Sequence, residues 1–166
     1  GASSCGSSDA KYKIWYWDIN AQLYSICALA TAESVDGVNW TNDTTLSQSG
    51  TPLVTGDCGT DGGTGWNRGS YGPVDLFYQP GVSNVGADPW AYSYVMYYDG
   101  TDGSSEVTGL AYSSDGLSWS AYSTSPVLDK GGGNAWDCDD AVYGTVYKDA
   151  YGYHFWYSGG GGDNGS

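Results

Sequence analysis

Basic side chains are scarce in this chain of 166 residues, in which lysine and arginine total 5 against 19 acidic residues. The formal net charge of −14 repels the phosphate backbone of nucleic acids and the surface of anionic membranes. We therefore predict neither nucleic acid nor membrane as a partner. The acidic excess is consistent with solubility or adaptation to salt, and alternatively with a carboxylate-lined site for cations or sugars.

Apolar runs of membrane-spanning length are lacking, and we expect no signal peptide, because residues 1–8 have neither a charged region nor an apolar core. We expect a mature or trimmed N-terminus. The Cys-x-x-Cys spacing of zinc sites is absent too, and the single histidine, His154, lies inside a strand pattern. An even set of cysteines predicts two disulfides in a secreted, periplasmic or extracellular protein, with three possible pairings. The set is Cys5, Cys27, Cys58 and Cys138.

Phenylalanine and methionine are rare, at 2 and 1 residues, whereas glycine, tyrosine and tryptophan number 27, 16 and 8. Glycine-rich turns between Tyr-, Trp- and Val-rich runs are typical of β structure, since aromatic and β-branched side chains suit a pleated, half-buried surface. The composition predicts an all-β protein.

Two segments align without a gap, Trp66–Tyr78 and Trp136–Lys148, and each precedes an aromatic strand, at 94–99 or 153–158. A third copy of that strand, at 13–18, has no such segment before it. The chain therefore begins and ends partway through an internal repeat. Tryptophans at recurring positions are predicted to belong to the core.

A second motif, Ser-x-Asp-Gly-x-x-Trp, occurs at 34–40 and 113–119. An Asp-Gly pair between apolar runs favours a type I′ hairpin turn. Asp36 and Asp115 are thus predicted to be structural. Between Leu29 and Asp36 this alignment requires two more residues than between Leu110 and Asp115, an insertion that preserves which face of the strand points inward.

The repeat unit is interpreted as four strands, at 72–78, 93–99, 107–112 and from Trp119. Segment 25–31 is its counterpart to the third strand, although 21–33 alone could form an Ala-rich helix. We predict one incomplete β-propeller domain over 1–166, with a partial blade at 13–65, a full blade at 66–135 and a partial blade at 136–166. A β-sandwich of two antiparallel sheets is the alternative.

These segments supply about nine strands, and two copies would supply about eighteen, close to the roughly twenty of a five-bladed ring. A homodimer that completes the ring is therefore predicted. The alternative is that the chain is a piece of a longer propeller.

The motifs at 94–100, 109–119, 153–159, 15–18 and 34–40 resemble those of the five-bladed propeller glycoside hydrolases, which include arabinanases, xylosidases and fructosidases. The resemblance implies three carboxylates on the first strands of successive blades, acting as base or nucleophile, orienting group and acid. Here the matching strands carry Asp75, Asp137, Asp139 and Asp140. They lack a glutamate, and Gly72-Pro73 stands where the family has Asp-Pro. Glu33 and Glu106, the two glutamates of the chain, are predicted to face solvent.

If the chain is a hydrolase, we expect Asp75 and Asp140 to be catalytic; otherwise they cap a turn or bond a backbone amide. Arg68, Trp90, Asp137 and Asp139 are candidate ligand-binding residues. Arg68 alternatively forms a salt bridge, and Trp90 alternatively covers a neighbouring blade. His154 is expected to pack in the core or an interface.

The sequence favours a module that recognises carbohydrate rather than one that hydrolyses it, because the glutamate is missing. A glycoside hydrolase with a reduced set of aspartates, or a structural module without ligand, remains as an alternative. No cofactor is predicted; calcium held by Asp-rich loops at 57–61, 99–102 or 137–140 is the alternative, although none has EF-hand spacing.

Overall fold

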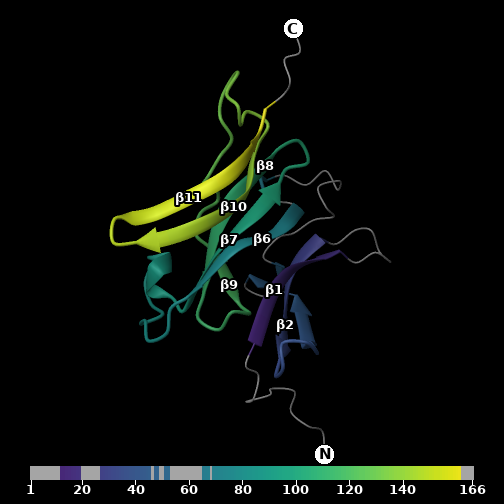
Figure 1. Cartoon of the computed structure of the whole chain (residues 1–166), viewed down its shortest axis with the longest axis vertical. Coiled ribbons are helices and arrows are strands. Elements are labelled where there is room, and N and C mark those ends of the chain that lie inside the picture. The colour runs from purple at the N-terminus through teal and green to yellow at the C-terminus, as the bar shows by residue number, and fades with distance from the viewer. Residues whose placement is uncertain are drawn as a thin grey trace, which may run out of the picture.

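The computed structural model describes residues 12–19, 27–45, 47–48, 51–52, 65–67 and 69–161, and it is an all-β structure, as predicted (Figure 1). Its helical content in these ranges is one short 3-10 turn, η1 (Pro89–Ala91). No helix within them has the length and apolar character needed to cross a membrane.

The central element is a meander of four antiparallel strands, in which each strand pairs with the next along the chain. This confirms the predicted four-stranded unit. The strands are β6 (Gly69–Tyr78), β7 (Tyr94–Thr101), β8 (Glu106–Ser113) and β9 (Trp119–Ala121).

An antiparallel unit lies on either side of this meander along the chain. The first has the order β1 (Tyr12–Ile19), β2 (Cys27–Ser34) and β3 (Thr41–Thr45). Its Ala-rich strand β2 confirms that a strand, not a helix, occupies the described part of the Ala-rich segment, from residue 27 on. A small hairpin, β4 (Ser47–Gln48) with β5 (Thr51–Pro52), follows it.

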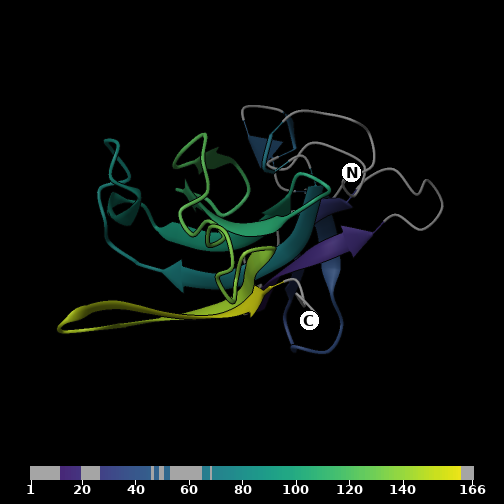
Figure 2. The same cartoon turned by 90° about the horizontal axis from the view of Figure 1, so that it is seen from above.

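The last two strands, β10 (Asp140–Asp149) and β11 (Gly152–Gly160), form a long hairpin beside the meander (Figures 1 and 2). One parallel pair, Asp140 with Glu106, connects β10 to β8. Three successive antiparallel units packed in this way are compatible with part of a propeller.

The two Ser-x-Asp-Gly turns have the same hydrogen bonds. Ser34 Oγ accepts the Gly37 amide at 2.8 Å, and Ser113 Oγ accepts the Gly116 amide at 2.9 Å. Asp36 Oδ1 accepts the amides of residues 38 and 39, and Asp115 Oδ1 accepts the amides of residues 117 and 118. All four of these distances are 2.8 Å. The structural role of both aspartates is thus confirmed.

The predicted type I′ geometry of these turns is wrong. Gly37 and Gly116 each have a φ of +77°, but neither aspartate has a positive φ. The serine and aspartate side chains bond the turn amides and replace the mirror-image backbone that a two-residue hairpin needs.

The predicted alignment of the first sheet is also wrong by one residue. Tyr12 lies opposite Ser34 and Tyr94 lies opposite Ser113, so Tyr12 is the counterpart of Tyr94, and no insertion separates Leu29 from Asp36. A shift of one residue exchanges the two faces of a strand. Trp15 therefore corresponds to Tyr97, not to Met96.

The repeated tryptophans at 66 and 136 lie flat on glycines. A Cβ built on Gly100 would lie 2.8 Å from Cζ3 of Trp66, and one on its counterpart Gly159 would lie 2.2 Å from Cζ3 of Trp136. Their ring centroids are 5.6 Å and 5.3 Å from Tyr98 and Tyr157 respectively. The repeat is thereby seen in equivalent contacts.

The prediction that recurring tryptophans belong to the core holds only for some of them. Trp119 is 1% exposed, but its counterpart Trp40 is 39% exposed and Trp136 is 63% exposed.

Each side of the meander packs on a neighbouring sheet. The side that carries Leu76, Met96 and Tyr98, the Met96 face, packs against Trp15 and Leu29 of the first sheet. Trp15 Nε1 also donates to the Gly116 carbonyl at 3.2 Å. The core thus lies between the first sheet and the meander.

The other side of the meander, the Tyr97 face, carries Asp75, Tyr97 and Asp99 and packs against the β10–β11 hairpin. The Tyr97 and Phe155 rings lie 5.5 Å apart, and Thr108 Oγ1 donates to the Ala141 carbonyl at 3.0 Å. This joint between sheets contains more polar groups than the first.

Candidate functional site

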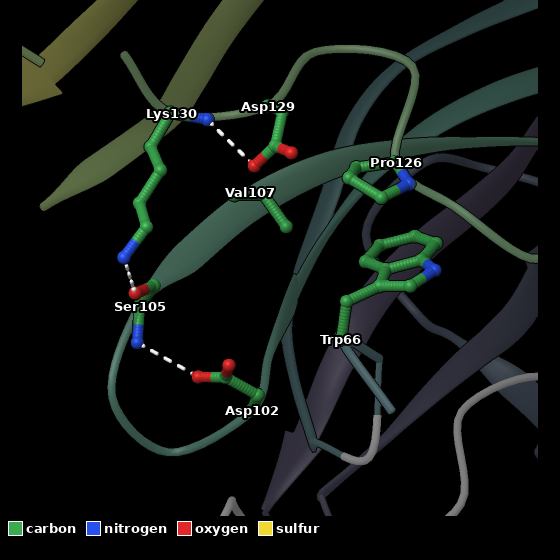
Figure 3. Close-up of a pocket in the computed structure, with 7 residues that line it drawn as sticks. All are labelled: Trp66, Asp102, Ser105, Val107, Pro126, Asp129 and Lys130. Atoms are coloured by element: carbon green, nitrogen blue, oxygen red, sulfur yellow. Dashed lines mark hydrogen bonds between the residues drawn. The ribbon is translucent and has the colours of Figure 1, made fainter. Parts of the chain in front are cut away.

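A pocket of about 210 Å³ lies where the β7–β8 turn, the residues just before β6 and the segment before β10 meet (Figure 3). Its apolar wall is formed by Trp66, Pro126 and Val107, and its polar rim by Asp102, Ser105, Asp129 and Lys130. This volume is below the roughly 300–1,000 Å³ of sites for drug-sized ligands, and it suits a single small ring.

The indole of Trp66 is fixed in this wall. Its Nε1 donates to the Thr124 carbonyl at 3.1 Å, and Gly100 and Gly109 leave no room for a side chain beneath the ring. The ring orientation is therefore set before a ligand arrives, which reduces the entropy lost on binding.

Each of the two acidic side chains of the rim has one carboxylate oxygen that is hydrogen-bonded within the protein and one that can accept from a ligand. Asp102 Oδ1 accepts the Ser104 hydroxyl at 2.7 Å and the amides of Ser104 and Ser105 at 2.8 and 2.9 Å, and these bonds lower the pKa of Asp102. Asp129 Oδ1 accepts the Lys130 amide at 2.8 Å. Each Oδ2 atom is without a hydrogen bond to the described residues, so both can accept from a ligand hydroxyl.

Lys130 is the cation of the rim. Its Nζ donates to Ser105 Oγ, and its charge contributes to the lowered pKa of Asp102 (Figure 3). An ammonium group has three donors, so Nζ can bond a ligand oxygen as well. The pocket thus offers two acceptors, one strong donor and an aromatic wall.

Asp137 supports the loop that carries Lys130. The Asp137 carbonyl accepts the Gly131 amide at 3.0 Å, and its Oδ2 accepts the Tyr157 hydroxyl at 2.8 Å. The second bond is the main cause of the raised pKa of Tyr157. Asp137 is 8% exposed, so it acts on the pocket through the loop rather than from within it.

Asp139 lies beside it, exposed, and its amide donates to the Gly160 carbonyl at 2.7 Å. The neighbouring Cys138 has a free thiol, so the predicted disulfide at Cys138 is wrong for this structure. Cys5, Cys58 and the side chain of Cys27 lie outside the described residues, and so does Arg68.

Asp75, Asp99 and Asp140 connect the meander to the hairpin, and we call them the three carboxylate ties. Asp75 Oδ2 accepts the Val146 amide at 2.8 Å, and Asp140 Oδ1 accepts the Glu106 amide at 2.8 Å. Such a bond to a neighbouring amide is the structural alternative considered for both predicted catalytic residues.

The two predicted catalytic carboxylates are not brought together. Val146 lies six positions after Asp140 on β10. At about 3.3 Å per residue, the carboxylates are on the order of 15–20 Å apart. Glycosidase pairs are separated by about 5–10 Å.

Asp99, the third tie, was considered from the sequence only as a possible calcium ligand. It is 2% exposed, and burial raises its pKa to about 6. Thr108 Oγ1 and the Tyr143 amide donate to it, at 2.8 and 3.0 Å. Tyr143 has a φ of +51° at an irregularity of β10, an unfavourable conformation for a residue with a side chain.

The two glutamates were predicted to face solvent, but each is half-buried and contacts another side chain. Glu106 belongs to β8, is half-buried, and lies 3.4 Å from the Tyr143 hydroxyl. Glu33 forms an ion pair with Lys13 at 3.2 Å.

Trp90 lies at the opposite end of the meander from the pocket. Its ring stacks on Tyr153 of the hairpin with centroids 4.2 Å apart, and Lys148 Nζ lies 5.2 Å from the indole centroid. This is the covering contact considered as the alternative to sugar stacking. His154 is exposed and lies 3.2 Å from Asp149 Oδ2, so it does not belong to the core.

Sequence reasoning missed the pocket because Trp66 recurs as Trp136 and was therefore assigned to the core. A usable signal was present in Lys130, since the chain has only 5 basic residues. Asp102 was considered only as a calcium ligand. Among the described residues, no group of three His, Cys, Asp or Glu side chains could hold a metal ion.

No family model and no curated protein matches this chain. Among the solved structures, it is similar to an N-acetylgalactosamine deacetylase from F. plautii, solved in complex with blood group B trisaccharide. The two share 18% identity with a TM-score of 0.52, over 80% of this chain and 32% of the deacetylase. The chain thus spans about a third of that protein, and the likeness shows a similar fold.

Proposed function

We propose that the chain binds carbohydrate, with one sugar ring held in the Trp66 pocket. The observation that carries this proposal is the combination of a fixed indole with two carboxylate acceptors and an ammonium donor around about 210 Å³. A sugar ring has an apolar face that suits an aromatic wall, and hydroxyl groups that need both acceptors and donors.

The acidic character of the chain supports a neutral polyol over an anionic ligand. Asp102 and Asp129 repel an anion, whereas their Oδ2 atoms can accept hydroxyl protons. The similarity in fold to a deacetylase that was solved with a trisaccharide is consistent with this ligand class.

Binding is favoured over hydrolysis by the placement of the carboxylates. Asp75 and Asp140 are too far apart to act on one glycosidic bond, and each bonds a backbone amide of a neighbouring strand. Hydrolysis by this reduced set of aspartates is the second candidate, and it is supported by the resemblance of the sequence motifs.

Titration calorimetry with galactose, N-acetylgalactosamine and blood group B trisaccharide tests the proposal. Lys130→Met should weaken binding about tenfold or more, because a hydrogen bond to a charged group contributes about 1.5–3 kcal/mol. Lys148→Met is the matched control, since Lys148 lies at the opposite end of the meander against Trp90.

Absence of binding to every sugar of a broad glycan array would contradict the proposal and favour a structural module. Equal binding by the two lysine variants would place the sugar elsewhere. Turnover of chromogenic glycosides that is lost in folded Asp75→Ala or Asp140→Ala would instead establish the hydrolase.

A further inference from the structure

The outward side of the β10–β11 hairpin carries large aromatic side chains of the kind that pack between sheets, but these side chains are exposed. Tyr147 and Trp156 are each 58% exposed there, and His154 lies between them, with its ring centroid 5.9 Å from that of Trp156. We call this side the Trp156 face. Within it a groove of about 260 Å³ runs between Tyr143 and Trp156.

The internal repeat identifies what this face corresponds to. The pairing of β11 with β10 makes Trp156 the counterpart of Tyr97, and Thr145 that of Asp75. In the meander these positions belong to the Tyr97 face, which the hairpin covers. The Trp156 face is therefore the surface on which a next sheet would pack.

The two joints between sheets show which kind of surface covers such a face. The Tyr97 face receives the side of the hairpin that carries Val146 and Phe155. The corresponding Trp15 side of the first sheet receives the Met96 face. Phe155 is the counterpart of Met96, and Trp15 is the counterpart of Tyr97. In both joints, therefore, a face of the Tyr97 type packs against a face of the Met96 type.

One further surface of the Met96 type exists in the chain, on the first sheet. Tyr12 is the counterpart of Tyr94, as the pairing with Ser34 and Ser113 shows, and Ile14 is therefore the counterpart of Met96. These two side chains are 51% and 40% exposed. We call this side the Ile14 face.

We propose that the Trp156 face binds the Ile14 face of a second copy of this chain. Each copy carries both halves of the joint, so copies can join head to tail, and two copies satisfy both pairs of faces when the rotation between them closes the ring. Charge does not oppose the contact locally, because His154 is already near Asp149 and the aromatic groups around it are neutral. This proposal is independent of the sugar pocket.

Sedimentation equilibrium of the whole chain tests the contact. We expect a mass of about 35 kDa, twice the 17.5 kDa of one chain, or a longer head-to-tail series. Trp156→Glu and Ile14→Glu should each weaken association at least about 30-fold, the effect of losing a central interface residue. Tyr151→Glu is the control, since Tyr151 is 94% exposed at the hairpin tip and outside both faces.

The mixing of variants separates this contact from a symmetrical one. Trp156→Glu and Ile14→Glu chains, each monomeric alone, should associate when mixed, because one intact joint remains. A monomeric parent chain would overturn the proposal. A dimer that survives Ile14→Glu would also overturn it, since it would show the hairpin pairing with itself. A monomer that binds oligosaccharide through Trp156 would overturn it as well. Circular dichroism establishes that each variant is folded.

Discussion

Asp99 should make the protein more stable as the pH falls from 7.5 to 5. Burial raises the folded-state pKa of Asp99 to about 6, whereas an unfolded aspartate titrates near 3.9. The folded state therefore binds the proton more tightly, and the stability that protonation supplies is complete below the unfolded pKa and lost as the pH rises through about 6. Between pH 7.5 and 5 the gain is about 1.4 kcal/mol, which corresponds to about 3–5 °C in melting temperature.

Thermal unfolding followed by circular dichroism at half-unit pH steps measures this gain. Asp99→Asn removes the titrating group, so its melting temperature should lie on a flatter line whatever its absolute value. Asp88→Asn is the control, because Asp88 is an exposed carboxylate that caps η1 by accepting the Trp90 amide. It should retain the parental slope. A parental melting temperature that falls from pH 7.5 to 5, or an equal slope in Asp99→Asn, would refute the reasoning.

Two further substitutions test the packing. Gly109→Ala should lower the free energy of unfolding in urea by about 1–3 kcal/mol, because the added Cβ would displace Trp66. Gly132→Ala is the control and should cost little, since Gly132 has open space around it. Equal costs would show that the indole moves freely. Asp75→Ala should lower the free energy of unfolding by about 1–3 kcal/mol, because it leaves the Val146 amide unpaired. It should leave sugar binding, measured by calorimetry, unchanged. A loss of binding in the folded variant would place Asp75 in the sugar site.

The strands were predictable because their sequence signals are local. Aromatic- and Val-rich runs between glycine-rich turns, together with their repetition, predicted the meander, and the repeat correctly outweighed the helical tendency of the Ala-rich segment that became β2. The Ser-x-Asp-Gly motif predicted where a turn occurs. It did not predict the geometry, because side-chain bonds from Ser34 and Asp36 replace the backbone conformation that an Asp-Gly pair usually adopts.

The faces and the site depended on contacts between distant residues. Choosing Lys13 rather than Tyr12 as the counterpart of Tyr94 changed the alignment by one residue, and only the pairing with Ser34 corrects it. The pocket was hidden for a related reason. Lys130 is separated from Ser105 by 25 residues, and no local pattern brings them together.

The two joints between sheets differ in how they resist sliding. The first is mainly apolar contact around Leu29 and Met96, which has little directional preference, whereas the three carboxylate ties hold the hairpin to the meander through directional bonds. Shear between sheets should therefore concentrate at the first joint, and the meander and hairpin should move as one body. Three of the 19 acidic residues are thus expected to set which of the two joints slides first.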